Sequence, residues 1–169
     1  MYVNAFIHEK YNVMKRWLPY ILGISILFLA QSCSKGVLSG DRQVRSSDIV
    51  GQWVLTESAD NSGSGWYYYK TGLERGVFTF YNNNGAEYED GYNQMTGLWD
   101  IATTSGGYYD QYGKYRNDLH QTFEIHVDDR FTNNSIDLYF DDVSVTNSNI
   151  IATSYKGNTV SRYIFSRNY

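Results

Sequence analysis

The chain is poor in cysteine and in proline. Its 169 residues contain one cysteine, Cys33, and one proline, Pro19. A single cysteine excludes an internal disulfide, so packing alone has to stabilise the folded domain. No window after residue 38 keeps an apolar period of 3.6 residues. This excludes a helical domain, and at most one short helix is expected.

Long apolar runs are absent as well. The longest, Ile21 to Ala30, has ten residues, whereas a membrane-spanning helix needs about 20. Lys15 and Arg16 precede this run and small residues follow it, a three-part pattern that is typical of an export signal. The alternative is a buried core helix, but Pro19 and the change to polar sequence after Cys33 argue against it.

Cys33 follows this segment, in the context Leu29 to Lys35 (LAQSCSK). The context resembles the lipobox of bacterial lipoproteins. Its last four residues, Ser32 to Lys35, are similar to those found at this place in Bacteroidetes-type lipoproteins. The resemblance implies that the Cys33 thiol receives acyl chains such as palmitate and anchors the protein in the cell envelope, at the outer membrane. Plain secretion is the alternative. A lone thiol outside the cytoplasm is reactive, intermolecular or modified, and lipidation explains why Cys33 has no partner.

These features divide the chain into three parts. Residues 1–32 are expected to form the signal peptide, and we expect translation to begin at Met14, which opens a natural signal sequence. Residues 33–47 are expected to form the lipidated N-terminus and a flexible tether. Residues 48–169 have the length of one domain with a substantial core.

The charge balance limits the partners. The chain has 14 Lys and Arg against 18 Asp and Glu, a net charge of −4. An acidic domain without a basic stripe is not expected to bind nucleic acid. It is also not expected to bind an anionic membrane surface except through its own anchor.

Aromatic residues, in contrast, are abundant: 17 Tyr, 8 Phe and 4 Trp, together with 15 Gly. Aromatic and β-branched residues favour strands, and Gly, Asn and Asp favour turns. The sequence predicts an all-β fold, an antiparallel up-and-down meander that closes into a barrel of roughly eight strands and so removes its exposed edges. The expected strands are residues 49–56, 76–81, 86–89, 97–101, 119–127, 135–140, 150–155 and 159–166, with a turn at 105–107.

Two of these strands show a clear period of two. In residues 119–127 one parity is expected to face the core: Leu119, Phe123, Ile125 and Val127. Residues 135–140 alternate in the same way. After Asp141-Asp142 the apolar parity changes to Val143 and Val145, which predicts a bulge at that point.

Two Gly-x-Trp triplets open predicted strands, Gly51-Gln52-Trp53 and Gly97-Leu98-Trp99. Residues 78–85 form an apolar strand that enters an Asn-Gly turn, and the last strand contains Arg162 and Arg167. In this order, over about residues 48–167, the motifs resemble the small lipocalin-like lipoproteins of Bacteroidetes-type bacteria. The resemblance implies a lipocalin-like barrel in which Trp53 fills the closed end and Arg162 or Arg167 stacks on its ring. A Tyr-rich insert from Ala102 to Asp118 departs from the family pattern.

Catalytic and metal-binding patterns are weak. The sequence has no Gly-x-Ser-x-Gly elbow, and a lipidated Cys33 cannot act as a nucleophile. Glu87, Glu89 and Asp90 form a carboxylate group, but nothing places two of them across a cleft, as glycoside hydrolysis requires. His120 and His126 would be about 20 Å apart on one strand, and the Asp128-Asp129 and Asp141-Asp142 pairs lack a calcium-loop pattern. We therefore expect no enzyme activity, no cofactor and no metal.

Two aromatic segments are the candidate binding residues: Trp66, Tyr67, Tyr68 and Tyr69 in the first, and Tyr108, Tyr109, Tyr112 and Tyr115 in the second. Either one parity of each run fills the barrel, or the rings form a binding surface, since exposed aromatic clusters are uncommon without a partner. The leading hypothesis is a lipid-anchored protein that binds a small apolar ligand in the barrel mouth. The alternative is a surface interaction module that binds glycan or protein through the aromatic loops.

Overall fold

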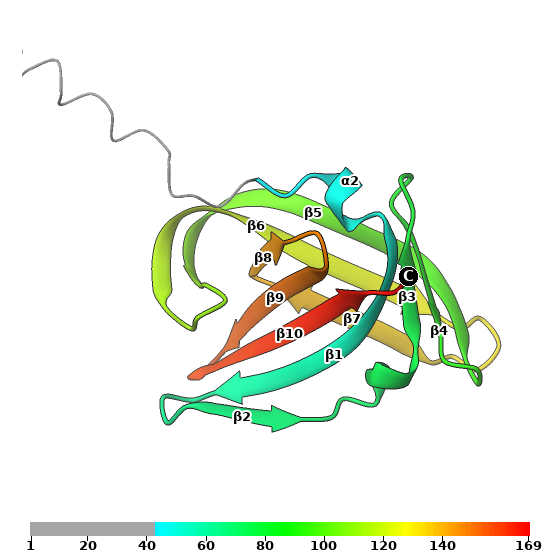
Figure 1. Ribbon diagram of the computed structural model, residues 1–169, viewed down its shortest axis with the longest axis horizontal. Coiled ribbons are helices and arrows are strands. Elements are labelled where there is room, and N and C mark those ends of the chain that lie inside the picture. Colours follow the sequence, from blue (N-terminus) through cyan, green and yellow to red (C-terminus); the bar gives the residue numbers. More distant parts are fainter. Residues whose placement is uncertain (1–42) are drawn as a thin grey trace, which may run out of the picture. The chain divides into compact units, whose positions relative to one another are not determined.

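Most consecutive strands lie side by side in one antiparallel sheet (Figure 1). The computed structural model describes residues 43–169. In chain order its elements are α2 (Ser46–Ile49), β1 (Gly51–Asn61), β2 (Trp66–Tyr69), the 3-10 helix η2 (Leu73–Arg75), β3 (Val77–Phe80), β4 (Gly85–Glu89), β5 (Gln94–Tyr109), β6 (Tyr115–Asp128), β7 (Ser135–Phe140), β8 (Asp142–Val145), β9 (Asn149–Lys156) and β10 (Thr159–Arg167).

The hydrogen-bonded order is β7-β6-β5-β4-β3-β1-β10-β9-β8, and β2 pairs with β1 beside this path. The prediction of an all-β antiparallel fold is therefore confirmed, with ten strands in the described part of the chain. The ladder does not close into a barrel, because β7 and β8 are its two ends. A single residue, Asp141, separates these end strands, and its N–H donates to the Thr153 carbonyl of β9 at 2.8 Å.

Aromatic rings fill the inner face of the sheet. Between ring centres, Phe140 of β7 lies 6.3 Å from Phe165 of β10, and Phe80 of β3 lies 5.7 Å from Phe123 of β6. These pairs join strands that are distant in the hydrogen-bonded order, so the sheet curls around one core. The largest fully buried side chains are Trp53, Trp99, Tyr88, Phe78, Phe80, Phe123, Phe140, Phe165, Ile49, Leu55, Ile125 and Ile150.

The predicted alternation in β6 is correct along most of its length. Phe123, Ile125 and Val127 are at most 1% exposed, but Leu119 is 71% exposed, and its predicted place in the core is wrong. At Leu119 the strand has already run past the core. The predicted change of parity near Asp141 is confirmed, since Phe140 and Val143 on either side of the Asp pair are both buried. The bulge predicted there is wrong, because Asp141 separates two strands with different partners: β7 pairs with β6, and β8 pairs with β9.

The turn predicted at residues 105–107 is wrong, because these residues lie inside β5. β5 and β6 pair continuously from Thr96 opposite Asp128 to Tyr109 opposite Tyr115, so the insert at 102–118 is the outer half of one long hairpin. The chain reverses at residues 110–114 instead. There the Gly113 N–H donates to the Asp110 carbonyl at 2.8 Å, and Gly113 has a φ of 75°, which glycine adopts without strain.

The structure describes the last five residues of the expected tether, 43–47. Val44 is 7% exposed, its N–H donates to Gln121 Oε1 at 2.7 Å, and its carbonyl accepts from Gln121 Nε2 at 2.9 Å. The chain from Val44 onward therefore belongs to the folded domain. The expected signal peptide, Cys33 and the rest of the tether lie outside the described residues.

Candidate functional site

Trp53 and Arg167 form a stack at the start of β1. The Arg167 Cζ lies 4.2 Å from the centre of the Trp53 ring. Its guanidinium nitrogens donate to the carbonyls of Val50, Asp48 and Asn147 at 3.1–3.3 Å. Gly51 makes room for this arrangement, because a Cβ there would lie 2.7 Å from Arg167 Nη1. The stack thus joins the first strand to the last strand of the sheet.

Gly97 and Trp99 repeat the motif in β5. A Cβ on Gly97 would lie 2.0 Å from the His126 carbonyl oxygen, so glycine is required for the close approach of β5 and β6. The Trp99 indole N–H donates to the Tyr81 carbonyl at 3.0 Å. Since Trp53 and Trp99 are at most 2% exposed, both motifs stabilise the fold and neither presents a ring to a ligand.

The tip of the β5–β6 hairpin lies on the outer face of β9 and β10. Thr153 Oγ1 donates to the Tyr109 carbonyl at 2.7 Å, and Arg162 Nη1 donates to the Gln111 carbonyl at 3.3 Å. Thr153 and Arg162 are opposite each other in the ladder and share a face. Ala152, the neighbour of Thr153, packs in the core, so alternation places Thr153 and Arg162 on the outer face. Figure 1 shows the hairpin bending back toward these strands.

Arg162 lies at the centre of this contact. Its Cζ is 4.2 Å from the centre of the Trp66 ring, and its Nη2 donates to Glu57 Oε1 at 2.8 Å. The side chain is 16% exposed, and its Nε is buried without a hydrogen-bond partner. Of the two arginines expected near Trp53, Arg167 makes that stack, whereas Arg162 connects β2 to the hairpin tip.

The hairpin tip is organised by Asp110, which is 8% exposed. Its carboxylate accepts from the backbone N–H groups of Tyr112 and Lys114, both at 3.0 Å, and from Arg116 Nε at 2.9 Å. Burial by itself raises the pKa of the Asp110 carboxyl, but these three donors outweigh burial and lower the pKa. The tip is therefore a turn built around one ionised side chain.

β2 divides its four aromatic residues between two faces. Tyr68 is opposite Ala59, and Ala59 is opposite Arg162, so Tyr68 and Trp66 share the outer face with Arg162. A Cβ on Gly113 would lie 3.4 Å from Trp66 Cζ2, which places the hairpin tip against β2. The two aromatic segments singled out in the sequence therefore meet on this face.

The other predicted binding residues do not join this contact. Tyr69 donates its hydroxyl to Tyr163 at 3.2 Å, and burial together with this bond raises the pKa of Tyr69. Tyr67 shares the face of Tyr69 and is 73% exposed. Tyr108 stacks on His120, with ring centres 4.1 Å apart.

We call the outward rings at this contact the aromatic surface: Trp66, Tyr68, Tyr109, Tyr112, Tyr115 and Tyr155. Tyr109 lies 4.5 Å from Tyr155 of β9 and 5.5 Å from Tyr115, measured between ring centres. Tyr68, Tyr112 and Tyr115 are each more than half exposed. Sequence reasoning missed Tyr155, Glu57 and Gln111. Of these three residues, only Tyr155 could have been predicted, because the alternation of side chains in β9 places it on the outer face.

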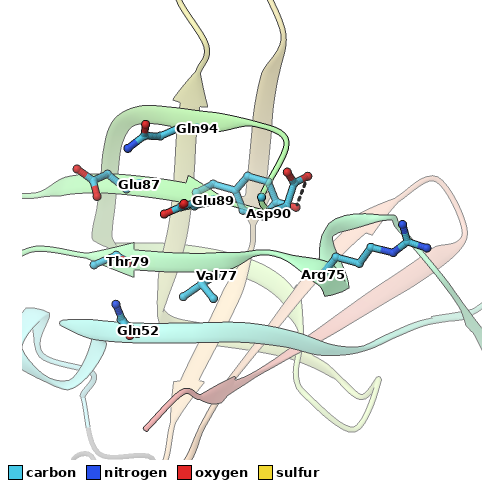
Figure 2. Close-up of a pocket in the computed structure, with 10 residues that line it drawn as sticks. Gln52, Arg75, Val77, Thr79, Glu87, Glu89, Asp90 and Gln94 are labelled. Carbon is cyan, nitrogen blue, oxygen red and sulfur yellow. Dashed lines mark hydrogen bonds between the residues drawn. The ribbon is translucent and has the colours of Figure 1, made fainter.

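A polar groove lies on the outer face of β1, β3, β4 and β5 (Figure 2). Its volume is about 330 Å³. The short side chains of Val77 and Thr79 on β3 run between Gln52 of β1 and the longer Glu87 and Glu89 of β4. The groove is therefore a shallow trough along β3 with hydrogen-bonding groups on both sides, and it offers no apolar pocket.

The predicted carboxylate group lies at this groove. Glu87 and Glu89 project from the same face of one strand, as Figure 2 shows, and Asp90 belongs to the following turn. Asp90 Oδ1 accepts from the N–H groups of Tyr92 and Asn93 at 2.9 and 2.8 Å. These carboxylates do not come from opposite walls of a cleft, the arrangement that glycoside hydrolysis uses.

The two histidines of β6 have separate partners. His126 Nδ1 bonds to the Asp137 carboxylate, whereas His120 stacks on Tyr108. Asp129 is occupied in its own turn, where it accepts from the Phe131 N–H at 2.8 Å. Within residues 43–169, no three His, Cys, Asp or Glu side chains are grouped to hold a metal ion.

Helices are short throughout the described residues, and none has the length and apolar character to cross a membrane. Comparisons with protein-family models, with curated proteins and with solved structures found no match for this chain.

Proposed function

We propose that this protein is a lipid-anchored binding module of the bacterial cell envelope. Residues 1–32 are its export signal, Cys33 carries the lipid, and the folded domain is non-catalytic and binds glycan on the aromatic surface. The curled sheet is a lipocalin-like barrel in this proposal. The single residue between β7 and β8 supports that description, since these strands are the two ends of the ladder.

The observation that carries the proposal is the division of the rings between inside and outside. Phe78 lies 4.7 Å from Tyr88 and 5.6 Å from Phe165, so side chains occupy the interior that a small apolar ligand would need. Tyr68 and Tyr112 remain outside, 58% and 76% exposed. This division favours ligand binding on the outer surface over binding in a barrel mouth, which was the leading hypothesis from the sequence.

The chemistry of the surface favours a glycan. Its rings belong to five tyrosines and one tryptophan, which combine a flat apolar face with a polar O–H or N–H tip. Such rings stack on the apolar faces of sugars while their tips bond to hydroxyl groups. The arrangement also spans two elements, β2 and the hairpin tip, which suits an extended chain of sugars better than a single small molecule.

Affinity electrophoresis through gels that contain soluble polysaccharides tests this function. We expect the mature chain to be retarded by at least one polysaccharide. The double variant Tyr68→Ala/Tyr112→Ala should lose about thirtyfold in affinity, because the two rings contribute about 1 kcal/mol of stacking each.

Tyr92→Ala is the matched control, since Tyr92 is 90% exposed but lies in the β4–β5 turn, outside the aromatic surface. Equal retardation of the double variant and the wild-type chain would refute the assignment. Absence of retardation in every gel would instead favour a protein partner.

A further inference from the structure

The neck of the β5–β6 hairpin is largely exposed to solvent, and the bonds between Gln121 and Val44 lie at its base. Every residue from Ala102 to Ser105 is exposed, and so are Asn117, Asp118 and Leu119 on the paired strand. A two-stranded hairpin is at best marginally stable alone in water, so the neck does not fix the position of the tip. Gly106, with a φ of 142°, and Gly107 give the backbone its greatest freedom within this neck.

The tip is fixed by the Tyr109–Tyr155 ring pair, by the approach of Gly113 to Trp66, and by a small number of polar contacts. Two are the bonds from Thr153 and Arg162 to the carbonyls of Tyr109 and Gln111. A third is the bond from Ser144 Oγ to the Gln111 side chain at 3.4 Å. A surface contact of this size stabilises the docked tip by far less than the aromatic core stabilises the sheet.

Two side chains on the face that carries the docked tip are buried outside the core. Ala59 is 0% exposed and Val160 is 5% exposed, yet neither belongs to the core cluster. Both share the outer face with Arg162, because Ala59 is opposite Arg162 and Val160 is two residues from it in β10. The unpartnered Nε of Arg162 lowers the stability of the docked state.

We infer that the hairpin tip is a flap that opens at Gly106–Gly107 and is held closed by Arg162. What the flap controls rests on the proposed function, whereas the opening itself rests on the packing of the hairpin alone. When the flap is docked, Tyr109, Tyr112 and Tyr115 join Trp66 and Tyr68 in one surface. When it opens, the two halves of the aromatic surface separate. A ligand that spans both halves therefore binds the docked state and shifts the flap toward it.

Hydrogen exchange read by mass spectrometry tests the opening on the mature chain carrying Cys33→Ser. We expect the amides of residues 103–118 to exchange at least tenfold faster than those of β9 and β10. Arg162→Lys should accelerate exchange in 103–118 further, because lysine cannot contact Trp66, Glu57 and the Gln111 carbonyl together. Exchange of 103–118 as slow as that of β10 would overturn the inference.

A cross-link separates the flap from the proposed function. The pair Gln111→Cys and Ser144→Cys, joined by a short bifunctional thiol reagent, should slow exchange in 103–118 to the rate of β9. The control is the same double-cysteine chain in which each thiol is blocked by a monofunctional alkylating reagent, so that no cross-link forms. In the polysaccharide gels the cross-linked chain should be retarded more strongly than this control.

Equal retardation of the two forms would show that the flap does not control binding, and would overturn that part of the inference. If even the wild-type chain is not retarded, the proposed function fails, and the exchange rates still decide whether the flap opens.

Discussion

The guanidinium of Arg167 lies 4.2 Å from the centre of the Trp53 ring and bonds to three backbone carbonyls around it. Arg162 makes a contact of the same length with Trp66, five residues earlier in β10. The first stack joins β1 to β10, the first and last strands in the chain, over the core. The second joins β2 to the hairpin tip. Substitutions of these two arginines should therefore affect different properties of the protein.

Gly51→Ala should destabilise the fold by about 2–3 kcal/mol. The substitution forces a side chain into a φ of 134° and displaces Arg167 Nη1, which would lie 2.7 Å from the new Cβ. Gly63→Ala is the control, since Gly63 has a φ of 104° and no atom within 4 Å of its Cβ position. Chemical denaturation should give a larger loss for Gly51→Ala. Equal losses would mean that the contact with Arg167 contributes nothing.

Arg167→Lys should lower the free energy of unfolding by about 1–2 kcal/mol. Lysine keeps the charge but has one nitrogen in place of the planar group that spans three carbonyls and the Trp53 ring. Arg130→Lys serves as the comparison, because Arg130 is exposed in the β6–β7 turn. Tryptophan fluorescence during urea unfolding measures both variants. A loss at Arg130 as large as that at Arg167 would contradict the prediction.

The sequence was sufficient for the strands whose side chains alternate over the core. Phe123, Ile125 and Val127 in β6 are buried as predicted, because burial of one face is what produces the period of two. The same rule placed Leu119 in the core incorrectly. Periodicity reports which face a residue occupies, but not where along a strand the core ends.

The candidate site was less predictable. Ser105-Gly106-Gly107 has the composition of a turn, yet its ladder with residues 117–119 continues, and the reversal depends on Asp110 and Gly113. The docking of the tip uses the carbonyls of Tyr109 and Gln111. A backbone carbonyl is the same in every residue, so no sequence pattern marks it as the partner of Arg162.

Cys33→Ser should release the protein from the membrane fraction, because the substitution removes the thiol that would carry the lipid. Fractionation of cells followed by immunodetection measures the release, and Ser34→Ala, the neighbouring substitution, should leave the protein membrane-bound. Persistence of the Cys33→Ser chain in membranes would contradict the anchor. Detection of any peptide from residues 1–13 would separately contradict translation from Met14.

The pKa of His126 should lie above its ordinary value of 6.5. The hydrogen bond that the His126 ring donates to the Asp137 carboxylate is the main cause, and the charges of Asp137 and Asp128 add to it. A raised pKa stabilises the fold at low pH, and this contribution is lost as the pH rises through the raised pKa. NMR titration of the ring measures the value, and Asp137→Asn should lower it. A titration that is unchanged in this variant would exclude Asp137 as the cause.

Asp110→Asn should loosen the hairpin tip while leaving the sheet intact. The asparagine amide cannot replace the ionised acceptor of the Tyr112, Lys114 and Arg116 donors. Because the pKa of Asp110 is lowered in the folded state, its contribution is present at neutral pH and is lost as the pH falls through that lowered pKa. Acidification of the wild-type chain should therefore reproduce the effect of the substitution.

Hydrogen exchange of residues 108–116, compared with β1 and β10, measures this local loss. We expect faster exchange in 108–116 alone, together with an unfolding midpoint close to that of the wild-type chain. Glu124→Gln, an exposed carboxylate of β6 outside the hairpin tip, is the control and should leave exchange at the tip unchanged. If Asp110→Asn instead lowers the stability of the whole sheet, the tip and the core unfold together, and the hairpin is not an independent unit.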